Sequence, residues 1–351
     1  MSLHEFSLID RFFAPLMGGD RIWLLDDGAV LPSSLTPGLT SGLTPDLTTG
    51  PDQQTVIATD TLIAGVHFRG RDPADRIAKK ALRTNLSDLA AMGATPFGYL
   101  LNLSLPADIT ESWLASFSSG LAQDQKRFKV KLLGGDTTKV NGPLVITITV
   151  LGTVPAKMAL ARRKAQPGDR LYVSSTLGDS AVGLQVLEEN FKAVPQDLKS
   201  HFIDRYQLPQ PRLSLGQKLR GCAHAAIDIS DGFLADLEHI CKASDLSAWV
   251  QLSALPVSSF LQELLDCGND QRKNQLLNLI LNGGDDYELI FTAPPSESDH
   301  IAFLSQSLNL PITLVGHLGG YDSDEDKNRI HLLNEHNQSI GLHFKGYEHT
   351  W

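Results

Sequence analysis

Short apolar runs recur along the chain and are separated by stretches with helical periodicity. Leu144–Val154 is the longest nearly apolar run; it is too short to span a bilayer and predicts a buried strand. Other apolar runs predict strands over residues 21–25, 55–59, 131–133, 170–174, 225–229 and 287–292. Strands and amphipathic helices alternate in both halves of the chain, which predicts an α/β or α+β fold.

One predicted helix begins after Asp72 and ends at Gly93. Asp72 is a candidate cap, Pro73 suits the first turn and Gly93 suits the residue past the end. Asn85 and Asp88 fall within the apolar arc of this helix, at ~100° per residue. A buried carboxylate needs a cation or several donors. We therefore interpret Asp88 as a metal ligand, with pairing to an arginine as the structural alternative. The apolar arc consists of Ile77, Ala78, Ala81, Leu89 and Met92.

The second half predicts two further helices, over residues 179–189 and 233–241, the latter with Ser230 as a possible cap. A basic linker at 162–164, followed by a turn at 166–169, precedes this second set of elements. A length of 351 residues favours two domains. We predict domains 1–156 and 157–351, with an exposed Leu/Thr/Pro-rich insert over residues 33–54 of the first.

Composition limits the possible functions. The apolar share of 42% and charged share of 20% are typical of a globular protein. A formal net charge of −10 argues against a nucleic-acid partner. Cys222, Cys241 and Cys267 have no CxxC spacing and are interpreted as reduced thiols, with metal ligation as a remote alternative. The first residues lack the order of a signal peptide, so we expect a cytoplasmic protein without a membrane partner.

Acidic clusters follow several of the predicted strands. Carboxylates at such places repel one another, so a cation is expected between them, and Mg²⁺ carrying a polyphosphate is the commonest case. The clusters are Leu25-Asp26-Asp27-Gly28, Thr59-Asp60-Thr61, Gly134-Gly135-Asp136-Thr137-Thr138, Asp228-Ile229-Ser230-Asp231-Gly232 and Gly283-Gly284-Asp285-Asp286. We interpret the third as a turn between two strands.

The residue types suit phosphoryl transfer. Gly134 and Gly135 would let backbone amides approach a phosphate, and Arg162 could clamp one in a bidentate way. His67, just past a strand end, is as suited to a structural role as to a functional one. P-loop, dinucleotide-binding, zinc-protease and nucleophile-elbow motifs are absent from the sequence. Candidate metal ligands are Asp27, Asp60, Asp88, Asp136 and Asp228.

These motifs, in this order, resemble the thiamine-monophosphate kinase family. The resemblance runs from Glu5-Phe6-Ser7-Leu8-Ile9 to Lys345-Gly346-Tyr347 and omits only the insert. Besides the acidic clusters, it rests on Gly65-Val66-His67-Phe68, on the run Asn85-Leu86-Ser87-Asp88-Leu89-Ala90-Ala91-Met92-Gly93-Ala94 and on Asp286-Tyr287-Glu288-Leu289.

The resemblance implies transfer of the ATP γ-phosphate to thiamine monophosphate, the final step of thiamine diphosphate synthesis. It implies several Mg²⁺ ions, direct in-line attack and no residue acting as a covalent catalyst. The implied fold is an N-terminal domain whose sheet forms a barrel-like homodimer interface, followed by a C-terminal α/β domain. The implied metal ligands are Asp27, Thr59, Asp60, Asp88, Asp136, Asp228 and Asp231; the implied ATP contacts are Gly135, Asp136, Arg162 and Ser230; the implied substrate contacts are His67, Asp285 and Tyr347.

Three positions depart from the family pattern. Leu25 stands where glycine is usual, Ala58 where Ser or Thr often supplies a metal oxygen, and Asp285 where glutamate is commoner. None of these changes removes a carboxylate, so we expect an active enzyme. The superfamily implied by the resemblance also includes aminoimidazole ribonucleotide synthetase and selenophosphate synthetase. Two alternatives therefore remain: an ATP-dependent synthetase of that superfamily, and a non-catalytic dimer that binds nucleotide. A selenophosphate synthetase would carry a reactive cysteine near its N-terminus, whereas the first cysteine here is Cys222.

Overall fold

The computed structural model describes residues 9–17, 26–31, 53–191, 194–321 and 328–340. The chain forms two compact units. The N-terminal unit consists of Gly28–Ala159 and Gln207–Arg220, and the C-terminal unit of Met1–Asp27, Leu160–Tyr206 and Gly221–Trp351. Both contain a sheet and helices, so the predicted two-part α/β architecture is confirmed. Leu25, Tyr347, the strand predicted over 21–25 and all but the last two residues of the insert lie outside the described residues.

The N-terminal unit is built on a five-stranded sheet with the order β1-β2-β5-β3-β4. All neighbouring strands are antiparallel except β3 and β4, which are parallel and joined through α3. The elements are β1 (Ala29–Leu31), β2 (Gln53–Ile63), α2 (Ala74–Ala91), β3 (Thr95–Leu105), α3 (Glu111–Phe128), β4 (Lys131–Lys139), β5 (Val145–Pro155) and α6 (Leu213–Leu219).

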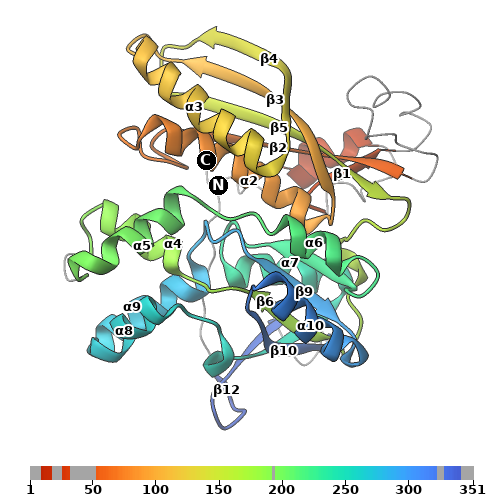
Figure 1. Ribbon diagram of the computed structural model, residues 1–351. Helices are drawn as coiled ribbons and strands as arrows, with labels where there is room; N and C mark the ends of the chain where they lie inside the picture. Colours follow the sequence, from red (N-terminus) through yellow and green to blue (C-terminus); the bar gives the residue numbers. More distant parts are fainter. Residues whose placement is uncertain (1–8, 18–25, 32–52, 192–193, 322–327, 341–351) are drawn as a thin grey trace. The chain divides into compact units, whose positions relative to one another are not determined.

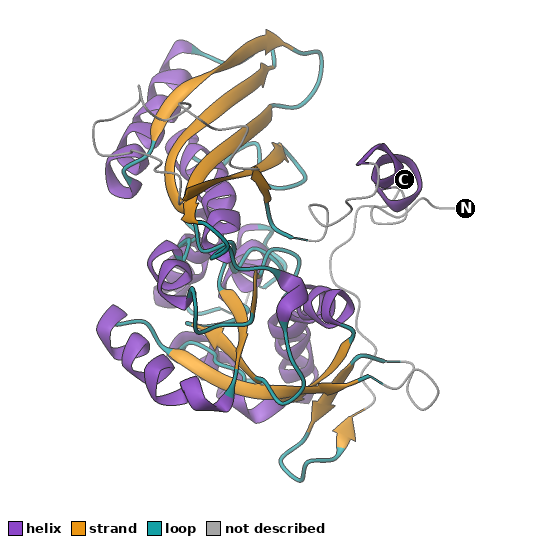
Figure 2. Cartoon of the chain, turned by 90° about the vertical axis from the view of Figure 1, so that its right-hand side faces the viewer, coloured by secondary structure: helices purple, strands orange, loops and turns teal. Residues whose placement is uncertain are grey.

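Helices α2 and α3 cover one face of this sheet (Figures 1 and 2). Strand β5 alternates in burial, as a half-covered strand should: Ile146, Ile148 and Val150 are inaccessible, while Thr147 and Thr149 are partly exposed. The buried residues of β5 therefore face the helices, and the threonines lie on the uncovered face. Within α2, the side chains of Leu82, Leu86 and Leu89 are also inaccessible and complete the core.

The interpretation of Gly134-Gly135-Asp136 as a turn is wrong, because these residues continue β4. The strand runs on to Lys139 and pairs in parallel with β3, with Gly135 opposite Leu101 and Asp136 opposite Asn102. Gly135 has φ +151°, and a Cβ there would lie 1.8 Å from the carbonyl oxygen of Leu101. The glycine thus allows the two strands to approach closely, instead of reversing the chain.

The predicted cap of α2 is also wrong. The helix begins at Ala74 with Pro73 as the N-cap, and no side chain caps it. Asp72 instead accepts hydrogen bonds from the Arg69 amide at 3.0 Å and from the Gln207 side chain at 2.8 Å. The predicted end is confirmed, since Gly93 follows the helix with φ +67°. Asp72 thus fixes the chain before the helix and not the helix itself.

The C-terminal unit has a seven-stranded sheet with the order β12-β11-β8-β10-β6-β9-β7. Its strands are β6 (Arg170–Ser174), β7 (Ala225–Asp228), β8 (Leu246–Gln251), β9 (Leu289–Ala293), β10 (Ile312–Gly320), β11 (Ile330–Leu333) and β12 (Ser339–Ile340). Its helices are η1 (Ile9–Phe13), η2 (Ala14–Met17), η5 (Arg162–Lys164), α4 (Asp179–Leu187), α5 (Gln196–Gln207), α7 (Phe233–Ser244), η6 (Leu252–Ala254), α8 (Ser259–Cys267), α9 (Asp270–Asn282), η7 (Pro295–Glu297) and α10 (Ser298–Leu308).

Two predicted boundaries in this unit need correction. The strand predicted from Tyr287 begins at Leu289, because Tyr287 has φ +51°, in the left-handed region. Helix α7 has Gly232 as its N-cap, without a side-chain cap, so Ser230 does not cap it. The buried core beneath the sheet includes Phe202, Ile227, Phe233, Leu237 and Ile290.

Candidate functional site

The end of β7 and the loop that follows it carry three of the predicted site residues, Asp228 as the last residue of the strand and Ser230 and Asp231 in the loop. Its shape is set by Asp236 in the first turn of α7. One carboxylate oxygen of Asp236 accepts from the backbone amides of Ser230, Asp231 and Gly232, at 3.1, 3.1 and 3.2 Å. Because Gly232 has no side chain to cap α7, Asp236 satisfies these amides from within the helix.

This loop is joined to the loop that carries Asp285. The Asp285 amide donates to the Ser230 carbonyl at 2.9 Å. The Tyr287 amide donates to the Ile229 carbonyl, and the Ile229 amide donates to the Glu288 carbonyl, both at 2.8 Å. The structure therefore brings the predicted ATP contact Ser230 beside the predicted substrate contact Asp285. Asp285 has φ +68°, and such backbone conformations in non-glycine residues cluster at functional sites.

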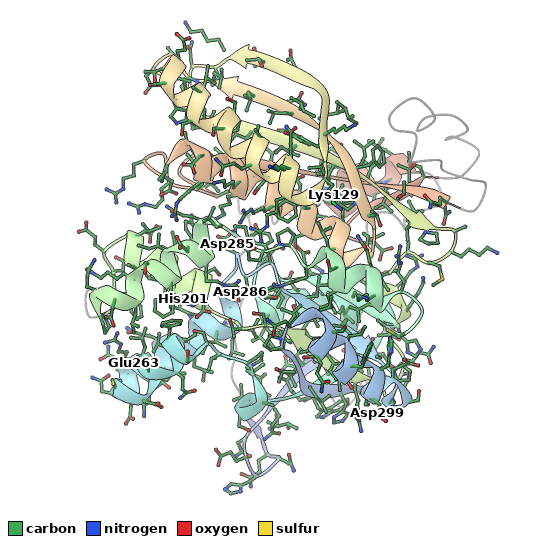
Figure 3. All side chains as sticks on the ribbon, viewed as in Figure 1. Lys129, His201, Glu263, Asp285, Asp286 and Asp299 are labelled. Carbon is green, nitrogen blue, oxygen red and sulfur yellow. The ribbon has the colours of Figure 1, made fainter. Side chains whose placement is uncertain are left out.

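The next acidic residues of that loop are structural. Asp286 is buried and accepts from the Gly178 amide and the Ser180 hydroxyl, both at 2.8 Å. Figure 3 shows Asp285 and Asp286 as neighbours in the loop before β9. Burial raises the pKa of Asp286 to about 7, against the opposing effects of its hydrogen bonds and of Arg205. Glu288, also buried, accepts from Ser174 at 2.7 Å and from Arg205 at 2.8 Å.

Arg162 and Asp27, predicted as an ATP contact and a metal ligand, pair with each other. The Arg162 amide also donates to Asp26 at 2.9 Å, and Asp26 pairs with Arg163. Burial lowers the pKa of Arg162, but the charge of Asp27 and its hydrogen bond outweigh burial, and Asp236 and Asp228 raise it further. The pKa of Arg162 thus lies above its usual value, and the side chain is a fixed cation among carboxylates.

The carboxylates of this loop repel one another. The pKa of Asp236 is raised well above its ordinary value, first by burial and then by the charges of Asp231 and Asp228, although Arg162 opposes the shift. Such a cluster gains stability from a further cation. The donors are carboxylate oxygens, the ligands that Mg²⁺ prefers, so the residues fit that ion.

In the N-terminal unit, Asp60 is positioned by a buried amide. The Asp60 backbone amide donates to Asn85 Oδ1 at 2.9 Å, and Asn85 Nδ2 donates to the Ala81 carbonyl at 2.9 Å. Asn85 is inaccessible, and Asp88 lies three residues later on the same face of α2, partly buried. Asp60 therefore lies beside the face of α2 that carries Asp88, within the N-terminal unit.

Thr59 and Asp136 lie on the other face of this sheet. Asp60 is opposite Ile148, which faces the helices, whereas Thr59 is opposite Thr149. The Thr59 hydroxyl contacts Thr149 Oγ1 at 3.0 Å and donates to the Ile148 carbonyl at 3.1 Å. Asp136 shares a row of paired residues with Asn102, Thr147 and Thr61. By register, the side chains of Thr59 and Asp136 are therefore separated from Asp60 by the thickness of the sheet.

His67 closes the turn after β2. Its Nδ1 accepts from the Ile63 amide at 3.0 Å, and its own amide donates to the Ile63 carbonyl at 3.0 Å. This bond assigns the proton of the neutral ring to Nε2. The structural role considered for His67 is therefore present, and the second ring nitrogen is held in one orientation.

Sequence reasoning missed Asp236 and the pair Arg205–Glu288. Asp236 has a signal in hindsight, because it follows Asp231-Gly232 by a helical turn, where a carboxylate reaches the free amides of a helix start. The Arg205–Glu288 pair joins residues 83 apart, and no local pattern marks it.

Comparison with known proteins identifies the family. Residues 25–154 match the model of the AIR synthase related protein, N-terminal domain. Thiamine-monophosphate kinase of Haemophilus influenzae is 42% identical over 316 residues, which cover 90% of this chain and 89% of the relative. The Escherichia coli K12 enzyme of the same name is 40% identical over 351 residues, with 99% of both chains covered. The chain belongs to the thiamine-monophosphate kinase family.

A solved structure of this family supports the fold. AaThiL complexed with AMPPCP and TMP aligns with a TM-score of 0.80 and 26% identity, covering 99% of this chain and 97% of that one. The predicted resemblance to the thiamine-monophosphate kinase family is thereby confirmed. Among the described residues, no helix is long and apolar enough to cross a membrane.

Proposed function

We propose that this protein transfers the γ-phosphate of ATP to thiamine monophosphate, yielding thiamine diphosphate and ADP. The observation that carries the proposal is the match to thiamine-monophosphate kinases over nearly the whole chain at 40% identity. The complex of AaThiL with AMPPCP and TMP supports both substrates. A biosynthetic kinase also agrees with the cytoplasmic location expected from the reduced cysteines.

The decisive experiment is a product assay. Purified full-length protein with ATP, Mg²⁺ and thiamine monophosphate is expected to release ADP and thiamine diphosphate in equal amounts, measured by chromatography. Thiamine and other phosphate monoesters serve as competing acceptors. Reaction with another acceptor but not with thiamine monophosphate would overturn the substrate assignment. Turnover of ribonucleotide substrates instead would favour the synthetase alternative, and tight ATP binding without any product would favour the non-catalytic dimer.

We propose Mg²⁺ as the metal, present as several ions, with Asp27, Asp228 and Asp231 as ligands in the C-terminal unit and Thr59, Asp60, Asp88 and Asp136 as ligands in the N-terminal unit. Because the side chains of Thr59 and Asp136 lie on the sheet face opposite Asp60, they would bind a different ion from Asp60. The mutual repulsion around Asp236 supports a cation beside Asp228 and Asp231. Bound Mg²⁺ neutralises the charge of the triphosphate. The remaining assignments are Gly135, Asp136, Arg162 and Ser230 for ATP, and His67, Asp285 and Tyr347 for thiamine monophosphate, with the last outside the described residues.

Replacement of metal ligands tests this part of the proposal. Asp60→Asn and Asp88→Asn keep size and remove one charge, so turnover should fall by about 100-fold or more while the unfolding free energy changes little. Asp75→Asn is a matched control, because Asp75 lies on the same helix but pairs with Lys79 at 3.2 Å. Unchanged kcat in both variants at saturating Mg²⁺ would show that Asp60 and Asp88 are structural.

We further propose a homodimer through the uncovered face of the N-terminal sheet. Paired threonines line this face: Thr61 contacts Thr147 at 2.8 Å and Thr59 contacts Thr149 at 3.0 Å. Leu100 is opposite Thr149 on this face and is 39% exposed. Light scattering should give twice the chain mass of 38.2 kDa. Leu100→Lys should shift the protein toward monomer, and a monomeric parent protein would overturn the proposal.

A further inference from the structure

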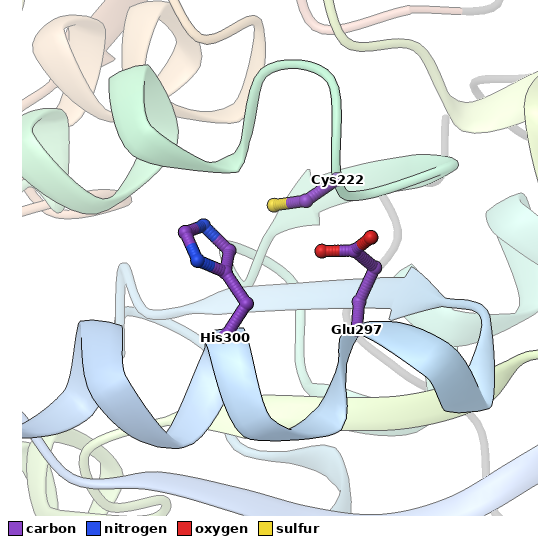
Figure 4. A group of neighbouring side chains, drawn as sticks. All are labelled: Cys222, Glu297 and His300. Atoms are coloured by element: carbon purple, nitrogen blue, oxygen red, sulfur yellow. The ribbon is translucent and has the colours of Figure 1, made fainter.

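Three side chains with metal-binding atoms converge in the C-terminal unit, outside the residues assigned to phosphoryl transfer. The Sγ of Cys222, a carboxylate oxygen of Glu297 and a ring nitrogen of His300 all lie within 4.8 Å of one another (Figure 4). Glu297 ends η7 and is the N-cap of α10, and His300 lies in the first turn of α10, three residues later, so the two face one side of the helix start. Cys222 comes from the loop before β7.

Both sides of this cluster are fixed to neighbouring strands. After Cys222, the His224 amide donates to the Thr292 carbonyl of β9 at 2.8 Å. Between Glu297 and His300, the Ser298 hydroxyl accepts from Arg170 of β6 at 2.6 Å and donates to the Pro295 carbonyl at 2.7 Å. Since β6, β9 and β7 are adjacent in the sheet, the three side chains are mounted on one rigid support.

The surroundings suit a cation with open access. Cys222 is 8% exposed, whereas His300 is exposed and stacks on Phe303 with ring centroids 6.4 Å apart. Within the part of the chain that the structure describes, no lysine or arginine forms an ion pair with Glu297. The nearby His224 is already paired with Asp169 at 2.8 Å, so it does not compete for the same place.

We propose that Cys222, Glu297 and His300 form a binding site for Zn²⁺ or a similarly thiophilic divalent ion. Thiolate, imidazole and carboxylate are the ligands of zinc sites, and three protein ligands leave a fourth position for water. In tetrahedral coordination the ligand atoms lie roughly 3.3–3.7 Å from one another. Side-chain movements of about an ångström would therefore bring the three ligand atoms to coordinating positions. The thiolate ligand distinguishes this site from a Mg²⁺ site, for which only oxygen ligands are expected. A bound ion joins the loop before β7 to α10.

Cobalt spectroscopy tests the site without any reference to turnover. Chelator-treated full-length protein is titrated with Co²⁺ in the presence of millimolar Mg²⁺, which occupies oxygen sites. We expect one equivalent of Co²⁺ to produce a thiolate-to-cobalt absorption band in the near ultraviolet, and Zn²⁺ to displace it. Absence of a thiolate band, or a band that Zn²⁺ fails to remove, would overturn the proposal.

Matched variants assign the ligands. Cys222→Ser should abolish the thiolate band, and Cys267→Ser, which changes an exposed cysteine, should leave it intact. Because the His300 side chain is exposed, His300→Gln should leave the fold intact. It should weaken Zn²⁺ affinity by at least about tenfold. Asp299→Asn, at the exposed neighbouring position labelled in Figure 3, should bind as the parent protein does. A His300→Gln variant with parental Zn²⁺ affinity would exclude the site.

Discussion

The guanidinium of Arg162 pairs with the carboxylate of Asp27, which is almost fully buried. The proposed function gives the two residues different ligands, ATP for Arg162 and Mg²⁺ for Asp27, yet each neutralises the other in this structure. Binding of a magnesium nucleotide would offer each of them a new partner of opposite charge. The pair is therefore suited to exchange with the substrate, at the cost of an ion pair already formed.

Arg162→Lys should lower both stability and ATP affinity. Lysine cannot reproduce the two donors that Arg162 directs at Asp27, so the unfolding free energy should fall by about 1.5–3 kcal/mol in urea titrations. Arg163→Lys is the matched control, because Arg163 pairs with Asp26 but its side chain is 32% exposed against 18% for Arg162. Its effect should be below about 1 kcal/mol. Equal losses in the two variants would contradict the special role of Arg162.

Asp236 should be replaceable by asparagine but not by alanine. Asp236→Ala leaves three backbone amides without their acceptor and should cost about 3 kcal/mol or more. Asp236→Asn keeps an acceptor oxygen and removes the charge that Asp231 and Asp228 repel, so its stability should stay within about 1 kcal/mol of the parent. Both values follow from urea unfolding in the presence of chelator. Equal destabilisation by both changes would show that the charge itself is needed.

Asp286 should make stability depend on pH. Its pKa is raised from 3.8 to about 7 by burial, so the folded state holds a proton that the unfolded state has already released. Stability from this group is complete below pH 4 and is lost as pH rises toward 7, by at most about 4 kcal/mol. The difference in unfolding free energy, Asp286→Asn minus parent, should therefore increase between pH 4 and 7 and then level off. A difference that is constant with pH would contradict this assignment.

Gly135→Ala should destabilise far more than Gly134→Ala. The added methyl at 135 would meet the Leu101 carbonyl oxygen at 1.8 Å, and the φ of +151° is unfavourable for alanine. The backbone of β4 would have to move away from β3, at about 3 kcal/mol or more. At Gly134 the nearest atom is Leu100 Cδ2 at 3.7 Å, an ordinary contact, so the change should stay within about 0.5 kcal/mol. Thermal unfolding of the two neighbours makes the comparison, and similar melting temperatures would contradict it.

The sequence predicts the buried elements of the fold well, because burial imposes a regular pattern. The strands over 144–154, 170–174 and 225–229 occur within about a residue of the expected bounds. The structure of glycine-rich motifs is harder to predict, because glycines that permit a turn also permit close contact between strands. The segment from Gly134 to Thr138 illustrates this, because only the neighbouring backbone of Leu101 explains its glycines.

Candidate site residues are predictable as a set, but their partners are not. The acidic motifs mark where carboxylates lie along the chain, yet the pairing of Arg162 with Asp27 joins residues 135 apart. Helix starts are equally hard to predict from sequence. Asp72 and Ser230 are residue types that often cap helices, but neither caps the helix that follows it. A local pattern gives the chemistry of a side chain, and only tertiary contacts decide which neighbour uses it.

The backbone bonds that join the loop after β7 to the loop before β9 involve no side chain. Their strength is therefore indifferent to which amino acid occupies position 230 or 285, provided that the left-handed turn at 285 is tolerated. Aspartate at 285, where the family resemblance leads us to expect glutamate, can thus alter ligand preference while the loop framework persists. Because of this framework, the side chains at positions 230 and 285 can change during evolution without loss of the loop structure. Ligand specificity can therefore adapt while the architecture is maintained.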